Sequence, residues 1–372
     1  MNGREATPGA SGGPPQPRGG IEISTRRTPF FLGSLNHAGP YFHASGEGLT
    51  ICQLDEATGA IERLQVCPEA QNPIWMTRAG PVLWVATERY LDPGEISAFA
   101  WDGAGIPIRV GHAQSSHGGA ICHIGMTPDR RVAFVSSYLG GLSVHQILET
   151  SEVSPAHQIV TYEGSGPNRE RQEKPHPHQA VVSPDGGRLF VSDLGSDRIW
   201  IHQLCGIRLG PAQSVPTPPG SGPRHLVCHP TLPRIYLLGE LDAQIHVYEP
   251  SGDRLRLLSS HRTLPRDFSG VAAAAAIKFH PSGKALIVSN RQSDTMTFFR
   301  VDGAGDLTEA ACLSSEGKTP RDFAVSPSGC WLLVVNQDSH AIVPFELDSD
   351  CAVPTGLRGS SFTCGSPMCV IF

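Results

Sequence analysis

One imidazole, one carboxylate and three guanidiniums stand at the ends of short apolar segments in this chain of 372 residues. An imidazole or a carboxylate can accept or donate a proton near neutral pH when its surroundings adjust its pKa. Guanidiniums bind carboxylate and phosphate groups and can also face a developing oxyanion. The combination suits proton transfer on a small anionic molecule, provided that the fold brings the side chains together. They are His178, Glu240, Arg224, Arg291 and Arg321.

The elements that must position these residues repeat along the chain. Five stretches share one template, in which a proline separates two short apolar runs. Successive prolines are 56, 46, 51 and 46 residues apart. A loose period of about fifty residues, built from strands alone, is typical of a β-propeller. The prolines are Pro128, Pro184, Pro230, Pro281 and Pro327.

Each template contains three candidate strands. The run after the proline is rich in β-formers, as in RLFVSD (188–193), and a third run follows it, as in RIWIHQL (198–204). Two weaker copies lie upstream, at residues 72–101 and 27–54, and the second of them lacks its first run. The last residues, GSPMCVIF (365–372), resemble that missing run.

This pattern predicts an all-β fold, a single seven-bladed β-propeller. The C-terminal strand is expected to join the first blade and close the ring, because closure leaves no open sheet edge. The propeller is expected to occupy residues 26–372. Residues 1–25 begin MNGREATPGASGGPPQPRGG, and this Gly, Pro and Ser bias predicts a disordered tail.

The template also predicts which side chains share one height in the ring. The residue six before the proline lies at the mouth of the innermost strand, and the residue ten after it lies where the next strand returns to that face. The first position holds Cys122, His178, Arg224, Ala275 and Arg321, and the second holds Tyr138, Leu194, Glu240, Arg291 and Gln337. Packing alone would favour apolar residues here, so the charged members predict one pocket at the channel rim. Glu88 is the equivalent of the second position in the blade at 72–101.

These residues also allow purely structural interpretations. Arginine and glutamate at loop ends can form structural ion pairs between blades. His176 and His178 could lie on one strand face as two metal ligands, but no third ligand has suitable spacing, so no metal is expected. Asp193 and Asp197 are expected to lock turns rather than to act in catalysis.

Composition argues against several classes of protein. A formal charge of −6 and a pI near 6.2 give no sign of nucleic-acid binding. No apolar run approaches the roughly 20 residues of a membrane span, and the N-terminus lacks the apolar core of a signal peptide. The ten cysteines are scattered singly, which favours a reduced, cytoplasmic protein.

The motifs resemble one family. RQEKPHPHQAVVSPDGGRLFVSDLGSDRI (171–199) is similar to the signature of seven-bladed lactonase propellers, which include bacterial propeller-type 6-phosphogluconolactonases and fungal carboxy-cis,cis-muconate cyclases. GSGPRHLVCHP (220–230), HPSGKALIVSNRQSD (280–294) and TPRDFAVSPSG (319–329) match in the same order. The resemblance extends from about residue 28 to the end of the chain.

The resemblance implies a catalytic group of one His, two Arg and one Glu. By motif these are His178, Arg224, Arg291 and Glu240, which the blade positions also select. The further rim residues expected to bind substrate are His176, Arg171, Gln172, Arg321 and Glu88. The chain departs from the family pattern at SSY (136–138), where an Asn-Tyr pair is usual, and at Ala275.

What the resemblance implies is hydrolysis of an anionic sugar-acid lactone without a cofactor, with 6-phosphogluconolactone as the leading substrate. Glu240 or His178 would activate water, and arginines would hold the anionic tail and face the oxyanion. A carboxy-cis,cis-muconate cyclase could use the same residues to clamp carboxylates and move a proton. A third hypothesis is a non-enzymatic scaffold that binds a protein on one face. The choice of base, and a monomeric or dimeric state, stay open.

Overall fold

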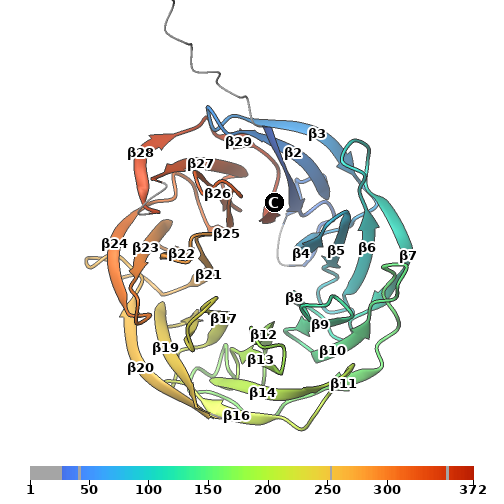
Figure 1. Ribbon diagram of the computed structural model, residues 1–372, viewed down its shortest axis with the longest axis vertical. Helices are drawn as coiled ribbons and strands as arrows, with labels where there is room; N and C mark the ends of the chain where they lie inside the picture. Colours follow the sequence, from blue (N-terminus) through green and yellow to red (C-terminus); the bar gives the residue numbers. More distant parts are fainter. Residues whose placement is uncertain (1–26, 41–42, 252–253, 349–351) are drawn as a thin grey trace, which may run out of the picture.

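The computed structural model describes residues 27–40, 43–251, 254–348 and 352–372. Within these residues the strands form seven antiparallel sheets, which stand as blades around a central channel (Figure 1). The same residues contain no helix that is long and apolar enough to cross a membrane. The predicted all-β, seven-bladed propeller is confirmed, whereas the predicted N-terminal tail lies outside the described residues.

Blades 1 to 3 show the common arrangement, with one strand beside the channel and the others following outward (Figure 1). Blade 1 contains, from the channel outward, β30 (Pro367–Ile371), β1 (Arg27–Ser34), β2 (Leu49–Asp55) and β3 (Ile61–Cys67). Blade 2 contains β4 (Pro73–Ala79), β5 (Val82–Thr87), β6 (Glu95–Ala100) and β7 (Ile108–Ser115). Blade 3 contains β8 (Ile121–Met126), β9 (Val132–Ser137), β10 (Gly141–Gln146) and β11 (Gln158–Val160).

Blades 4 to 7 follow the same order, and blades 4 and 7 each carry a second outer strand. Blade 4 contains β12 (Pro177–Val182), β13 (Arg188–Asp193), β14 (Arg198–Cys205), β15 (Arg208–Leu209) and β16 (Gln213–Pro216). Blade 5 contains β17 (Pro223–Cys228), β18 (Ile235–Gly239), β19 (Gln244–Ser251) and β20 (Arg254–Arg262). Blade 6 contains β21 (Ala274–Phe279), β22 (Ala285–Asn290), β23 (Thr295–Val301) and β24 (Leu307–Ser314). Blade 7 contains β25 (Pro320–Val325), β26 (Trp331–Asn336), β27 (Ala341–Leu347), β28 (Pro354–Arg358) and β29 (Phe362–Thr363).

The two ends of the described chain meet in blade 1. The C-terminal strand β30 is the innermost strand of that blade and pairs antiparallel with β1, with Phe31 opposite Ile371. The ring is therefore closed by the C-terminal strand joining blade 1, as predicted. Closure of this kind removes the open sheet edges on which other chains could pair.

The repeated prolines mark the turns between the first and second strands. In blade 4 the Gly186 amide donates a 2.8 Å hydrogen bond to the Ser183 carbonyl, with Pro184 and Asp185 between them. This is a four-residue turn in which proline supplies the fixed φ of the second residue. Gly186 has a φ of 73°, which glycine adopts without strain. The template of the sequence is thus a turn motif that reverses the chain at the face opposite the predicted site.

Apolar side chains fill the spaces between blades. Leu238, Ile245, Ile277 and Val288 belong to a buried cluster shared by blades 5 and 6. Strand β22 is buried at every residue, because both faces of a blade pack against neighbours. This packing fixes the blades relative to one another and so holds the channel rim rigid.

Every innermost strand is interrupted by a β-bulge at the same height. In blade 4, for example, Pro177 pairs with Asp193 and Gln179 pairs with Ser192, so His178 is left over between them. A bulge re-aims the side chain of the extra residue. The equivalent bulged residues are Met368, Ile74, Cys122, His178, Arg224, Ala275 with Ala276, and Arg321, from blade 1 to blade 7.

Candidate active site

The bulged residues converge on the axis of the propeller. Six of the seven blades place their bulged side chain around one small cavity of about 20 Å³. Three of these side chains carry basic groups, namely His178, Arg224 and Arg321, and the other three are Ile74, Cys122 and Met368. The convergence predicted for the first rim position is therefore present in the structure.

The second rim position is fixed by a repeated backbone hydrogen bond. Its amide donates to the carbonyl of the residue two before the bulge in the same blade. The distances are 3.0 Å from Glu88 to Asn72, 2.8 Å from Glu240 to Gly222 and 2.9 Å from Arg291 to Ala273. Glu88 in blade 2 and Glu240 in blade 5 thus occupy equivalent positions in the ring.

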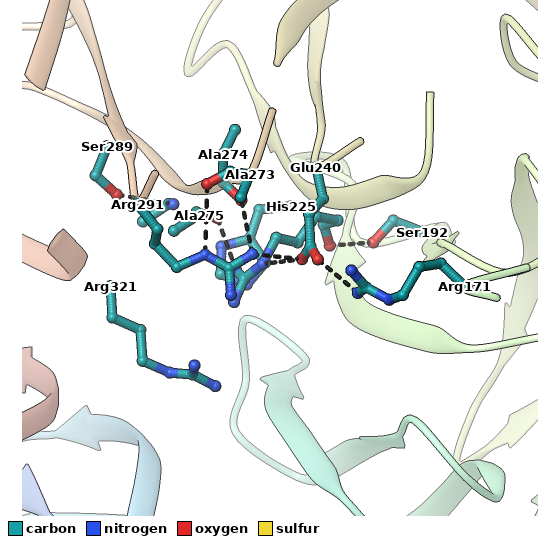
Figure 2. Close-up of polar contacts among 12 residues, drawn as sticks. Arg171, Ser192, His225, Glu240, Ala273, Ala274, Ala275, Ser289, Arg291 and Arg321 are labelled. Carbon is teal, nitrogen blue, oxygen red and sulfur yellow. Dashed lines mark hydrogen bonds and ion pairs between the residues drawn. The ribbon is translucent and has the colours of Figure 1, made fainter. Parts of the chain in front are cut away.

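Glu240 lies at the centre of a group of three arginines, called here the Glu240 cluster. Arg171 Nη2 approaches Glu240 Oε1 at 2.6 Å, and Arg224 Nε and Arg291 Nη2 each lie 2.9 Å from Oε2. Figure 2 shows Arg171 and Arg291 reaching the carboxylate from opposite sides. The Glu240 side chain is only 4% exposed. Burial would raise its pKa, but the charges of Arg291, Arg224 and Arg171 overcome burial and hold the pKa well below the ordinary value.

Arg224 links the Glu240 cluster to the neighbouring blade. Its Nη1 donates a 2.7 Å hydrogen bond to the Ala275 carbonyl and lies 3.1 Å from His225 Nε2. Burial, and then the charge of Arg291, lower the pKa of Arg224. The guanidinium is therefore bonded on several sides and rigidly oriented.

His178 is buried in the channel wall beside this cluster. Its ring centroid lies 5.2 Å from that of His225 and 6.4 Å from that of Tyr138. Nδ1 has no hydrogen-bond partner among the described residues. Burial, followed by the charge of Arg224, lowers its pKa well below the ordinary value, so the imidazole is neutral at pH 7.

Glu88 and Arg321 form a second part of the rim, called here the Glu88 side. Arg321 Nη1 donates to Gln337 Oε1 at 3.3 Å, and no carboxylate among the described residues lies within ion-pair distance of it. Figure 2 shows its side chain apart from the Glu240 cluster, with no contact drawn between them. Glu88 Oε1 accepts a hydrogen bond from the Tyr90 amide. Burial raises the pKa of Glu88 to about 7, and the charge of Arg321 opposes that rise.

Two of the predicted substrate-binding residues turn away from the cluster. The Gln172 amide is fully buried and bonds to the Leu194 carbonyl and to Asp197. The His176 ring stacks on Tyr138 at 3.9 Å, and its Nδ1 lies 2.8 Å from the Tyr138 carbonyl. Both side chains hold the segment before β12 in place.

Two aspartates near the rim hold the backbone rather than face the channel. Asp193 accepts hydrogen bonds from the His176 amide and from Trp200 Nε1, and Asp197 accepts from the Gly220 amide, so both lock turns as expected.

In the part of the chain that the structure describes, no three His, Cys, Asp or Glu side chains are grouped so that they could hold a metal ion.

Sequence reasoning missed the bulged residues of blades 1 and 2. Ile74 and Met368 line the axial cavity, and Trp75 lies beside them. Blade 1 has no turn proline from which to count, because its innermost strand comes from the C-terminus, and in blade 2 the turn proline, Pro81, lies seven rather than six residues after the bulged residue. A second signal was present, because a proline stands directly before the bulged residue in blades 1, 2, 4, 5 and 7. Aligning Pro73 and Pro367 with Pro177 would have found both residues.

Comparison with known proteins gives one consistent result. A family model described as lactonase, seven-bladed β-propeller, matches residues 36–372. The 6-phosphogluconolactonase of Bacillus subtilis strain 168 is 26% identical over 343 residues, which are 91% of this chain and 98% of that protein. The 6-phosphogluconolactonase of Formosa agariphila is 28% identical over 330 residues, which are 86% and 92% of the two chains.

A solved structure agrees in fold along nearly the whole chain. The periplasmic gluconolactonase of Pseudomonas aeruginosa is 29% identical, with a TM-score of 0.85 over 93% of this chain and 99% of that one. That protein is periplasmic, and the cytoplasmic location predicted for the present chain stays a prediction.

Proposed function

This chain belongs to the seven-bladed β-propeller lactonase family, and from that premise we propose that it hydrolyses an anionic sugar-acid lactone, most specifically 6-phosphogluconolactone. Membership of a lactonase family favours an enzyme over the non-enzymatic scaffold. The named relatives support the phosphorylated substrate, and the charge of the rim supports it independently.

The observation that carries the proposal is the excess of positive charge at the Glu240 cluster. Three guanidiniums share one carboxylate, so two positive charges lack a counter-charge within the cluster. Arg321 adds a further guanidinium without a carboxylate in ion-pair range among the described residues. A phosphate monoester carries close to two negative charges at neutral pH and accepts bidentate bonds from guanidiniums. A phosphorylated lactone therefore complements this rim better than a neutral sugar lactone.

The accessible arginines are suited to the anionic tail. The side chain of Arg171 is 43% exposed and that of Arg291 is 18% exposed, whereas that of Arg224 is only 4% exposed. Arg171 and Arg291 would hold the phosphate, with Glu240 and Arg224 fixing their orientation. Rigid placement of this kind keeps the lactone in a reactive position and lowers the entropic part of the barrier.

Arg321 and His178, which both line the axial cavity, would face the lactone carbonyl. Arg321 has hydrogen-bonding capacity left for an oxyanion, and the neutral His178 can donate one ring N–H. Donors already aimed at the position where charge develops stabilise the tetrahedral intermediate. Water would attack the carbonyl carbon directly, with a side chain as the general base and without a covalent enzyme intermediate.

The experiment is a turnover assay of the purified chain on three substrates, with spontaneous lactone opening subtracted. We expect 6-phosphogluconolactone to be opened with a higher kcat/KM than glucono-δ-lactone, and carboxymuconate to be left unchanged. Equal rates on the two lactones would refute the anionic-tail proposal. Turnover of carboxymuconate alone would replace the hydrolase with the cyclase.

A further inference from the structure

The hydrogen bonds of Glu240 leave it unable to serve as the proton acceptor. Both of its oxygens are held by guanidiniums, at 2.6 Å on Oε1 and 2.9 Å twice on Oε2. A proton arriving on either oxygen would have to displace a charge-assisted bond in a buried site. Glu240 is therefore a structural anion for its three arginines.

His178 is also poorly placed to accept the proton. It is buried in the wall, with the rings of His225 and Tyr138 around it. An imidazolium formed there would be desolvated and would face the guanidinium of Arg224. Both effects oppose protonation, so the neutral ring is better suited to donating a hydrogen bond.

Glu88 occupies the position across the ring that is equivalent to that of Glu240. Its backbone is fixed by the Asn72 carbonyl, and one carboxylate oxygen is oriented by the Tyr90 amide. No guanidinium among the described residues forms an ion pair with it. Burial and then the charge of Arg291 lower the pKa of Arg321. The charges of Glu240 and Glu88 act in the opposite direction, so this guanidinium lies within electrostatic range of both carboxylates.

We infer that Glu88 is the general base that activates the hydrolytic water, a role that rests on the proposed lactone hydrolysis. A Glu88 oxygen removes one proton from water as the water oxygen bonds to the lactone carbonyl carbon. The resulting oxyanion faces Arg321. When the intermediate collapses, the bond from that carbon to the ring oxygen breaks, and protonated Glu88 returns its proton to the ring oxygen. The product hydroxy acid then loses a proton to solvent, which leaves a carboxylate.

The surroundings of Glu88 suit a base that works near neutral pH. Burial raises its pKa to about 7, while the Tyr90 and Arg89 amides and the charge of Arg321 act in the opposite direction. Burial raises the pKa of the nearby Cys122 thiol to about 12, and burial followed by the charge of Glu88 raises the pKa of the Tyr90 phenol, so both groups stay uncharged. A base whose pKa lies near the working pH combines a populated basic form with useful basicity.

The test compares Glu88→Gln with Glu149→Gln, which makes the same change on an exposed turn. We expect Glu88→Gln to lower kcat by about 10²- to 10⁴-fold, the usual share of a general base. It should still bind 6-phosphogluconate, measured as a rise in melting temperature. Below about pH 7 the wild-type kcat/KM should fall tenfold per pH unit, and this limb should be absent from the residual activity of Glu88→Gln.

A second variant gives a readout that a purely structural role would not move. Because Arg321 lowers the pKa of Glu88, Arg321→Met should shift the acidic limb of kcat/KM to higher pH. An active wild type together with an active Glu88→Gln variant that keeps the limb would overturn the assignment of the base alone. An inactive wild type would overturn the proposed function and the base together.

Discussion

Glu240 and Glu88 stand at equivalent positions of two blades that face each other across the channel, yet their surroundings differ. Glu240 forms ion pairs with three guanidiniums, and these hold its pKa well below the ordinary value. Glu88 accepts a hydrogen bond from a backbone amide, and burial raises its pKa to about 7. One repeated backbone geometry therefore presents two carboxylates with opposite electrostatic character. Pairs of this kind divide the tasks of charge holder and proton carrier between like residues.

The largest expected effect is that of Glu240→Gln, which removes the carboxylate that pairs with three guanidiniums. Removal of this charge leaves three guanidiniums facing one another, two of them largely buried. Loss of one partner of a buried ion pair costs about 3–5 kcal/mol, so we expect a drop of this size in the free energy of unfolding and loss of lactone turnover. Urea denaturation and the lactone assay measure the two results.

Glu249→Gln is the matched control for that change. Glu249 also contacts two arginines, Arg234 and Arg256, but on the surface. We expect it to cost far less stability than Glu240→Gln, because water and salt screen exposed ion pairs, and to leave turnover intact. The cost of Glu240→Gln should also shrink as the pH falls, because a depressed pKa stabilises the fold above the unfolded-state pKa and this benefit is lost on acidification. Equal losses for both variants at pH 7 would contradict the special role of the Glu240 cluster.

Arg321→Met tests whether the two carboxylates and their surroundings have separate roles. Arg321 lacks a carboxylate partner among the described residues, so its removal should cost less stability than Glu240→Gln. Loss of an oxyanion donor lowers kcat by about 10²- to 10³-fold. Steady-state kinetics on 6-phosphogluconolactone would show this as a fall in kcat that exceeds any change in KM. A rise in KM with kcat unchanged would instead make Arg321 a tail-binding residue.

Much of this division could be predicted from the sequence, and the missing part has a physical cause. The prolines at the blade turns set the register, and counting from them reached His178, Arg224 and Arg321 because a bulge recurs at one height. Met368 was missed because blade 1 has no turn of this kind, and Ile74 was missed because the Pro81 turn of blade 2 has a different spacing. Gln172 was predicted to bind substrate because it follows Arg171 in the sequence, but its side chain bonds within its own part of the chain, to the Leu194 carbonyl.

The sequence could not show which groups contact each carboxylate. Arg171 comes from an irregular segment before β12, and only the folded path of that segment brings its guanidinium to Glu240. The spacing of residues specified that Glu240 and Glu88 share a height, but it did not specify how many guanidiniums each would meet. That number decides which carboxylate can accept a proton.

Glu88→Gln should also move stability, in the direction opposite to Glu240→Gln. A raised folded-state pKa means that ionised Glu88 destabilises the fold, so stability falls as the pH rises through about 7. We expect the amide to remove this penalty and to stabilise the protein by about 1–3 kcal/mol at pH 8.5. At pH 4, where the carboxyl is largely protonated in both the folded and the unfolded wild-type protein, the two proteins should melt alike. If Glu88→Gln instead destabilised the protein at pH 8.5, Glu88 would be a structural anion like Glu240, and the two carboxylates would not differ in role.

Arg171→Met has the smallest expected effect and separates binding of the tail from chemistry. Arg171 is 43% exposed, so loss of its ion pair with Glu240 should cost little stability. Arg224 and Arg291 continue to hold Glu240 in this variant. We expect KM for 6-phosphogluconolactone to rise about tenfold, equivalent to about 1.4 kcal/mol, with kcat nearly unchanged. The KM and kcat for glucono-δ-lactone, which has no phosphate, should be unaltered. An equal loss of kcat/KM on both lactones would mean that Arg171 acts by positioning Glu240 rather than by binding the phosphate.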